Sequence, residues 1–159
     1  IQFIYYCFLR PSRELPKLQA GDILMEEREI LVPGHKSKNK KSQYVAIPDV
    51  FFKQLAFVYE LGPAAYLFPS RINAQKPIGR NTMNNRHSRF LQALNFGAGY
   101  SLYSWKHTGV VKAYKKGIDI KAIQRQCRHS SIEMTDKYMR SLGFGKNEGF
   151  ASKIDEIEI

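Results

Sequence analysis

The sequence predicts an α+β fold that is mostly α-helical and contains one small antiparallel β-sheet. Hydrophobic residues recur at helical spacing over most of the 159 residues, and capping and helix-stop signals separate the segments. Three short apolar runs in the first third of the chain have the lengths of strands and are joined by turn signals. No internal repeat divides the sequence, so we expect one domain over residues 1–140 and a tail over residues 141–159.

The first part of the chain is predicted to hold the sheet between two helices. Residues 1–9 are apolar and indicate a buried helix, which ends near Arg10 because Pro11 disfavours the helical conformation of the residue before it. Asp49 is the expected N-cap of a helix that runs to about residue 61. The expected strands and their hairpin loop are residues 23–25, residues 29–32, the lysine-rich loop 35–42, and residues 44–48.

The remaining sequence is predicted to be almost entirely helical, after a short strand at 66–68 and a loop at 69–80. Gly117 is a helix-stop signal, and Asp119 is the expected cap of the helix that follows it. Ser130 and Glu133 have the spacing of a capping box for the last helix, which carries Tyr138. The other expected helices cover residues 104–115 and residues 83–94, the latter capped by Asn81 or Thr82 and exposing Arg86, His87 and Arg89.

The charge of the chain indicates a polyanionic partner. Its formal net charge is +11 and its pI is about 9.7. Residues 147–159 carry a net charge of −3, which leaves +14 on the rest. Nucleic acid is the first candidate, and an anionic membrane surface is weaker because no strongly amphipathic basic helix is present. No stretch approaches the roughly 20 apolar residues that cross a bilayer.

The two cysteines, Cys7 and Cys127, lie inside apolar helical patterns. We expect both to be reduced core thiols, and therefore a cytoplasmic protein, at the bacterial nucleoid if its partner is DNA. No residue pattern indicates a metal site or a cofactor. The chain begins at Ile1 inside an apolar helix without a cap, so we expect a fragment excised from a longer protein.

Several basic residues, a histidine and a tyrosine follow one another in an order that suits phosphodiester chemistry. Tyr138 comes nine residues after His129, Lys106 lies further upstream, and Arg10 stands in the run Phe8–Ser12. A tyrosine hydroxyl can attack a phosphodiester and store its bond energy as a phosphotyrosine ester. Cations around the non-bridging oxygens stabilise the charge that develops in the transition state.

These motifs resemble the catalytic domain of the tyrosine recombinases, the phage-type integrases, from about residue 3 to residue 138. The run Phe8-Leu9-Arg10-Pro11-Ser12 resembles the family's first arginine box, and Glu14 the acidic residue that follows it. The stretch from Gly117 to Gln124, followed by His129-Ser130-Ser131, resembles the family's most recognisable segment. The resemblance implies that Tyr138 is the nucleophile and that Arg10 and His129 contact the scissile phosphate.

One box departs from the family pattern, which is histidine, two residues, arginine, and then His-Thr. Here Tyr103 stands at the histidine position and Lys106 at the arginine position, before His107-Thr108. Lysine is a point charge and cannot make the planar two-pronged contact of a guanidinium, so we expect a weaker clamp from Arg10 and Lys106. His107 follows Lys106 directly, so a helix turns it about 100° away from Lys106, and we expect it to point away from the site.

The lysine-rich hairpin resembles the one that carries the family's general acid, which protonates the leaving 5′ oxygen. Counting back from the strand favours Lys38, and Lys40 stays open. We expect the duplex to be held by further basic residues on this hairpin and on the helix at 83–94, and most of that affinity to be independent of sequence. The expected DNA-binding residues are Lys36, Lys40, Lys41, Arg86 and Arg89.

The resemblance implies site-specific DNA recombination or integration for a phage or mobile element, without metal or ATP and through a 3′-phosphotyrosine link. In the full-length protein it implies a homotetramer on DNA, with the tail docked on a neighbouring protomer through Phe144, Phe150, Ile154 and Ile157. The family's N-terminal DNA-clamping domain is absent here, so we expect this fragment to be monomeric. Two alternatives stay open: a type IB topoisomerase-like enzyme, and a non-catalytic or weakened DNA-binding regulatory domain.

Overall fold

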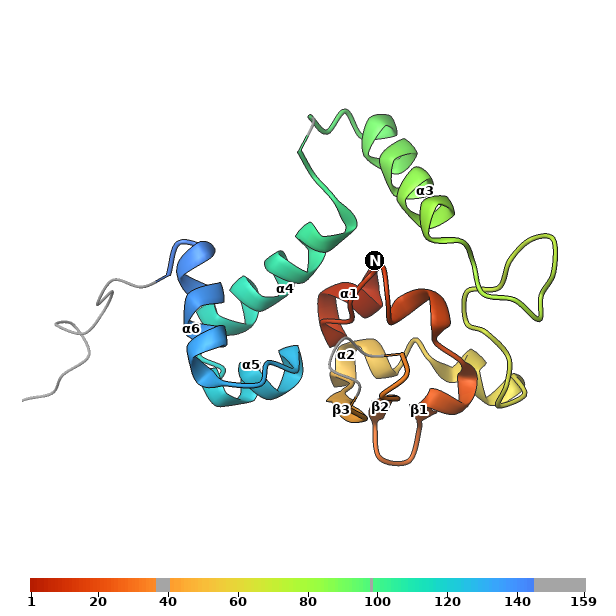
Figure 1. Ribbon diagram of the computed structural model, residues 1–159, viewed down its shortest axis with the longest axis horizontal. Coiled ribbons are helices and arrows are strands. Elements are labelled where there is room, and N and C mark those ends of the chain that lie inside the picture. The colour runs from red at the N-terminus through yellow and green to blue at the C-terminus, as the bar shows by residue number, and fades with distance from the viewer. Residues whose placement is uncertain (37–40, 98, 145–159) are drawn as a thin grey trace, which may run out of the picture.

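A computed structural model of the protein describes residues 1–36, 41–97 and 99–144 (Figure 1). It confirms the predicted α+β class, with mostly helical structure and one three-stranded antiparallel sheet. The elements in chain order are α1 (Gln2–Cys7), η1 (Leu15–Lys17), η2 (Ala20–Asp22), β1 (Ile23–Leu24), β2 (Glu29–Val32), β3 (Gln43–Ala46), α2 (Asp49–Phe52), η3 (Ala56–Glu60), α3 (Arg80–Ala93), α4 (Leu102–Lys115), α5 (Ile120–Cys127) and α6 (Ile132–Ser141), where η marks a 3-10 helix.

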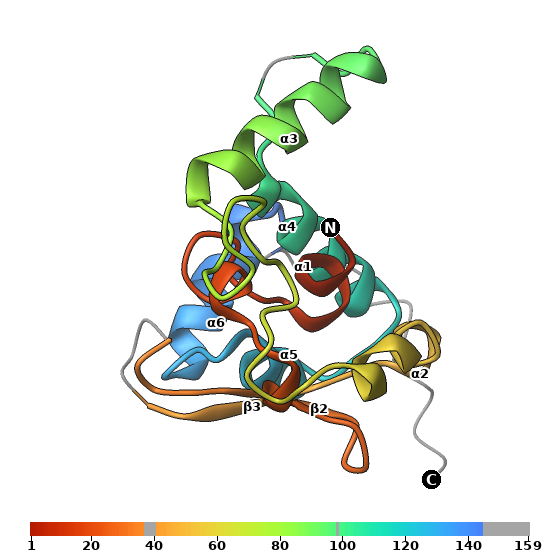
Figure 2. The ribbon, with the colours of Figure 1, turned by 90° about the vertical axis from the view of Figure 1, so that its right-hand side faces the viewer.

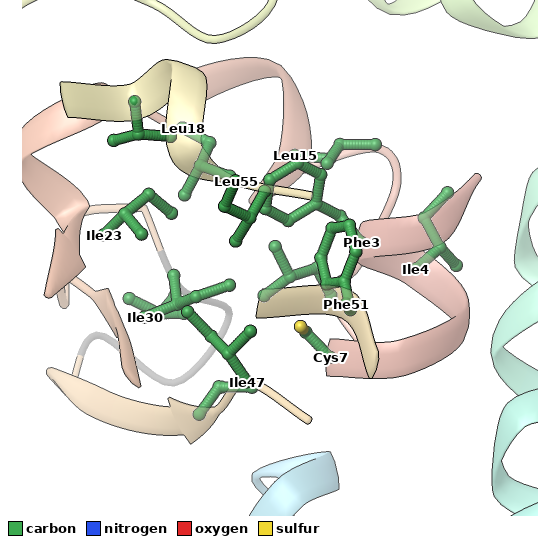
Figure 3. Packing of buried hydrophobic residues seen from close by; sticks show 14 of the residues in the cluster. Phe3, Ile4, Cys7, Leu15, Leu18, Ile23, Ile30, Ile47, Phe51 and Leu55 are labelled. Carbon is green, nitrogen blue, oxygen red and sulfur yellow. The ribbon is translucent and has the colours of Figure 1, made fainter. Parts of the chain in front are cut away.

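The sheet and α1 enclose the larger of two hydrophobic cores (Figure 3). The register pairs Ile30 of β2 with Ile23 of β1 and with Val45 of β3, so one face of the sheet presents an aliphatic row. Alternate residues of a strand point to the same face, and this face turns inward. Phe3 of α1 meets it, with its ring edge against Phe51 of α2 at a centroid distance of 4.8 Å. Helices α1 and α2 are thereby packed on the same sheet.

The smaller core lies between α4, α5 and α6 and contains Val110, Ile123, Cys127 and Met139. Its fifth buried member is Phe8, which comes from the end of α1. Phe8 therefore joins the N-terminal part of the chain to the C-terminal helices. Figure 1 shows the resulting arrangement, with α4 between α1 on one side and α6 on the other.

Helices α1 and α4 approach each other so closely that only glycine fits at position 109. A Cβ atom there would overlap the carbonyl oxygen of Tyr5 and would lie 2.9 Å from Cε1 of Phe8. The absence of a side chain lets the α1 backbone rest directly on α4. This contact fixes where the last turn of α1 lies along α4.

The Gln126 side chain of α5 is bonded to the backbone of the edge strand β3. Its Nε2 donates to the carbonyl of Ala46 at 2.8 Å, and its Oε1 accepts from the Ala46 N–H at 3.1 Å. An amide side chain here does what a neighbouring strand would do. The end of α5 is thereby fixed to the sheet.

Several predicted boundaries are wrong by a few residues. The helix expected from Asp49 to about residue 61 is the short α2 followed by the 3-10 helix η3, and the Asp49 side chain pairs with Arg28 at 2.8 Å instead of capping. The segment 66–68 forms only an isolated bridge between Tyr66 and Gln19. The three strands of the sheet, by contrast, lie within two residues of their predicted bounds.

Helix caps show the same mixture. The Asp119 carboxylate accepts from the N–H groups of Lys121 and Ala122, as predicted. The last helix is capped one residue later than expected, by Ser131, which has the extended backbone of an N-cap and accepts from the Met134 N–H. Helix α3 begins after Gly79, so neither Asn81 nor Thr82 caps it.

Helix α3 stands away from the rest of the molecule (Figure 2). A polar contact ties it to α4, since Trp105 Nε1 donates to Nε2 of His87 at 2.9 Å. His87 is therefore buried, and the prediction that it shares the exposed face with Arg86 and Arg89 is wrong. Those two arginines are exposed as expected.

Gly109→Ala should destabilise the fold, because the added methyl group forces α1 and α4 apart. We expect a loss of about 1–3 kcal/mol in the free energy of unfolding, typical of an overpacked core. Gly62→Ala is the matched control, since a Cβ there meets nothing within 4 Å. Chemical denaturation of both variants measures the difference, and equal stabilities would contradict the close approach.

Candidate active site

The site is assembled around the carbonyl oxygen of Phe8. Phe8 ends α1 in the left-handed conformation, with φ 51° and ψ 31°. Its oxygen accepts from the Lys106 ammonium of α4 at 2.9 Å and from Nη2 of Arg128, which follows α5, at 3.0 Å. Both cationic side chains are fully buried. Three segments far apart in sequence therefore meet at one backbone atom.

Glu14 holds the two arginines of the site together. Its Oε1 accepts from Nη1 of Arg10 at 2.5 Å, and its Oε2 accepts from Nη2 of Arg128 at 2.6 Å. The Arg10 backbone N–H also donates to Oε2 at 2.7 Å. Arg10 reaches the end of α5 as well, where Nη2 lies 3.5 Å from the carbonyl of Cys127. The Arg10 side chain keeps 15% of its surface exposed, so it can still meet a ligand.

A tight turn between α5 and α6 presents His129. The turn is made by Arg128 in the left-handed region, with φ 57° and ψ 46°. His129 Nδ1 lies 3.0 Å from the hydroxyl oxygen of Thr135, which is fully buried in α6. This hydrogen bond fixes the ring and leaves Nε2 for another partner. The His129 ring stands edge-on to Tyr138 at a centroid distance of 5.5 Å.

The hydroxyl of Tyr138 is hydrogen-bonded to Nδ1 of His107 at 2.8 Å. Helix α4 has neighbours on two sides, so Lys106 faces the end of α1 while His107, about 100° further round, faces α6. The expectation that His107 points away from the site is therefore wrong. Sequence spacing alone could not place it, because the position of α6 beside α4 decides the contact.

Tyr103 lies one turn before His107 on the same face of α4, with ring centroids 4.9 Å apart. The Lys106 ammonium lies 5.8 Å from the centre of the Tyr103 ring. Tyr103 keeps 36% of its surface exposed, so it borders the site at its open side. Residues 103–107 of α4, where the sequence departs from the family pattern, thus bring a phenol, an ammonium and an imidazole close together.

Burial and the neighbouring cations set the protonation states of the site. Burial lowers the pKa of Lys106 from its ordinary 10.5 to about 8. Burial also lowers the pKa of His129 to about 4, and the charges of Lys106, Arg10 and Arg128 add to this effect. His129 is therefore neutral at physiological pH, while Lys106 stays largely protonated and would be more so beside a phosphate.

The nucleophile candidate is neutral too. Burial, together with the neighbouring Cys127 and Tyr103, raises the pKa of Tyr138 above its ordinary value of 10. Burial and the charge of Lys106 lower the pKa of His107. A neutral imidazole at 2.8 Å can accept the phenolic proton, which a neutral Tyr138 must lose to act as a nucleophile.

A hollow of about 340 Å³ opens beside the His129 turn, on the side of β3. Two arginines and a histidine contribute to its wall, so it suits an anionic group. Its lining residues are Gln43, Tyr44, Gln124, Arg125, Arg128 and His129.

The expected lysine contacts divide into three cases. Lys36 is buried, and its ammonium is bonded to Asp22 Oδ2 at 2.6 Å and Gln19 Oε1 at 2.8 Å. The expectation that it lies on the exposed loop and holds DNA is therefore corrected: it anchors the hairpin to η2. Lys41 is exposed. Lys38 and Lys40 lie outside the described residues.

Arg86 and Arg89 lie on α3, the helix that stands away from the rest of the molecule (Figure 2). In the tail, Phe144 packs against Tyr114 of its own chain, with ring centroids 4.9 Å apart. Phe150, Ile154 and Ile157 lie outside the described residues. Among the residues described, no helix has the length and apolar character needed to cross a membrane.

A sequence model described as the phage integrase family matches residues 1–143. No curated protein shows a significant match to the chain.

Solved structures of tyrosine recombinases share the fold. XerA recombinase superposes with a TM-score of 0.74 at 19% identity, covering 98% of this chain and 57% of XerA. The Tn1549 transposon integrase in complex with a circular intermediate DNA gives 0.71 at 19% identity, covering 86% and 52%. XerH bound to its difH substrate gives 0.69 at 20% identity, covering 98% and 46%. The chain spans about half the length of these proteins.

Lys106 should make stability rise with pH. Its pKa is lowered in the folded state, so the unfolded chain binds more protons between pH 8 and 10.5 and folding gains stability across this window. The raised pKa of buried thiols and phenols acts in the opposite direction, so the readout is the difference between the protein and Lys106→Met. We expect that difference, from urea unfolding at each pH, to change in favour of the protein as the pH increases. A flat difference would contradict burial of the ammonium.

Proposed function

The chain belongs to the phage integrase family, and from this premise we propose that it is the catalytic domain of a tyrosine site-specific recombinase acting on double-stranded DNA. The observation that carries the proposal is a set of linked contacts. Lys106 is bonded to the Phe8 carbonyl, Arg10 reaches the Cys127 carbonyl at the end of α5, and the His129 ring just after α5 lies against Tyr138. Tyr138 attacks the scissile phosphate, which leaves a 3′-phosphotyrosyl link and a free 5′ hydroxyl. Attack by the 5′ hydroxyl of a partner strand reverses the step and exchanges the strands.

The side chains take distinct roles in this reaction. His107 accepts the proton of the Tyr138 hydroxyl as the oxygen bonds to phosphorus. The Arg10 guanidinium and the Lys106 ammonium stabilise the charge on the non-bridging oxygens, and His129 donates a hydrogen bond from Nε2 to one of them. Tyr103 stands at the open side of the site, where its hydroxyl can donate a further hydrogen bond. The hairpin lysine, Lys38 or Lys40, protonates the leaving 5′ oxygen.

The duplex is held largely by charge. Lys41, Arg86 and Arg89 are exposed and suit contacts with phosphates outside the site. On the full-length protein we propose a homotetramer on DNA, with the tail after residue 144 docked on a neighbouring protomer. The chemistry needs neither ATP nor a metal, because the tyrosine ester retains the energy for rejoining.

A duplex nicked near the cleavage point tests the proposal, because loss of the short strand traps the covalent intermediate. We expect a Tyr138-dependent adduct, visible as a shifted band on a denaturing gel, and none with Tyr138→Phe. Tyr100→Phe is the matched control, since this exposed tyrosine lies in the loop before α4.

The same assay separates the alternatives. Retained DNA binding with no adduct at any salt concentration would favour a binding module and contradict catalysis. Relaxation of supercoiled plasmid without site preference would favour the topoisomerase-like activity.

His107 should be needed for cleavage at neutral pH. Removing a general base costs about 10²–10⁴-fold in rate, so His107→Phe should lower the rate of adduct formation by at least the smaller factor. His107→Asn can still hold the phenol but is a poor base, so it should restore little. Stopped time courses at saturating duplex measure the rate, and an unchanged rate in His107→Phe would exclude this role.

A further inference from the structure

Arg128 occupies the centre of the site and has no place in the mechanism above. Its side chain is fully buried, and its acceptors include Phe8 O at 3.0 Å, Glu14 Oε2 at 2.6 Å and Gln126 O at 3.0 Å. A buried guanidinium is costly unless its donors find such partners. The contacts therefore explain how the charge is held but not why it is there.

The backbone of Arg128 adds a second cost. Its φ of 57° lies in the left-handed region, where glycine fits without strain and a side chain does not. A glycine would make the same turn more easily. Strain of this kind, at a residue whose side chain reaches the middle of the site, indicates a functional reason for the side chain.

Lys106 supplies that reason. Its ammonium and the Arg128 guanidinium share one acceptor, the Phe8 carbonyl, at 2.9 and 3.0 Å. The ammonium donates to this carbonyl, whereas Nη2 of the guanidinium donates both to the carbonyl and to Glu14. A lysine at 106 therefore leaves both the room and the acceptors for a guanidinium from another position.

The charges of the cluster depend on this guanidinium. Arg10, Lys106 and Arg128 are the cations, and Glu14 is the anion between them. With Arg128 present, Glu14 is shared by two arginines and the cluster keeps a surplus of positive charge for a phosphate. Without Arg128, Glu14 would be held by Arg10 alone and would neutralise the cation that is exposed to the ligand.

We propose that Arg128 is a positioning residue that takes the place of the guanidinium missing at position 106, by holding Glu14 and the Phe8 carbonyl so that Arg10 and Lys106 face the phosphate. The proposal rests on the proposed function. It implies that Lys106 and Arg128 form one unit, in which a lysine at 106 requires an arginine at 128.

Four variants test this unit by trapping on the nicked duplex: Arg128→Gly, Arg128→Lys, Lys106→Arg and the double variant Lys106→Arg/Arg128→Gly. Arg128→Gly should lower the trapping rate by about tenfold or more. Arg128→Lys should lower it nearly as much, because one ammonium does not replace two nitrogens, Nη2 on the Phe8 carbonyl and Glu14 and Nη1 on the Gln126 carbonyl. Lys106→Arg should also lower it, since two guanidinium groups would compete for one carbonyl. The trapping rate of the double variant should recover to within about threefold of that of the unchanged protein. Such a recovery means that the effects of the two substitutions are strongly coupled.

The pH profile distinguishes positioning from a purely structural role. The groups near Lys106 are Arg10 and Glu14 after α1, Cys127 at the end of α5, Arg128 and His129 after it, and Tyr103 and His107 on its own helix. Its lowered pKa of about 8 predicts that trapping by the protein declines on the alkaline side. The double variant, with a guanidinium at 106 that stays protonated, should lose that decline.

Each outcome decides the proposal. A rise in trapping with Lys106→Arg alone would overturn it, as would a double variant whose loss is the product of the single losses. Thermal unfolding and duplex binding check the fold, and if Arg128→Gly fails to fold, Lys106→Arg and Arg128→Lys still decide. If the unchanged protein forms no Tyr138-dependent adduct, the proposed function fails instead, and these comparisons do not arise.

Discussion

The structure depends on one backbone oxygen that accepts hydrogen bonds from two buried cationic side chains. The Phe8 carbonyl is turned out of α1 by a left-handed residue, and Lys106 and Arg128 reach it from α4 and from the end of α5. The Phe8 side chain meanwhile fills the core between α4, α5 and α6. The same residue thus joins the two cores by packing and assembles the charged cluster by hydrogen bonding. Gly109 permits the approach on which both depend.

Around this centre, the box at residues 103–108 lacks the histidine and the arginine of the family pattern, but an imidazole and a guanidinium lie close by in space. A tyrosine stands at position 103, and an imidazole lies one turn further along the same helix face at His107. A lysine stands at position 106, and a guanidinium enters from Arg128. In the proposed mechanism, the chemical groups of the box are thus supplied by other positions of the chain. Such relocation is open to a site built from several elements, because what matters is where the groups meet.

Much of the fold was predictable from local signals, since the strands, most helices and the Asp119 cap follow from patterns within a few residues. In the site, motif order singled out Arg10, Lys106, His129 and Tyr138, which the structure brings near one another. Contacts between elements were not predictable. His107 is placed by the position of α6 against α4, and Arg128 by a left-handed turn that residue type does not favour. Lys36 was misjudged because its partner Asp22 is distant in sequence and offers a buried carboxylate.

The bond between Gln126 and the edge strand has a mechanical consequence. Gln126 lies three residues before His129, and its amide grips the backbone of the strand that leads out of the lysine hairpin. A load applied to that hairpin by a bound duplex would be transmitted through Ala46 to the histidine turn rather than dissipated in a loop. The same amide also occupies the N–H and the carbonyl of Ala46 on the edge strand β3, which hinders pairing of this edge with a strand of another molecule.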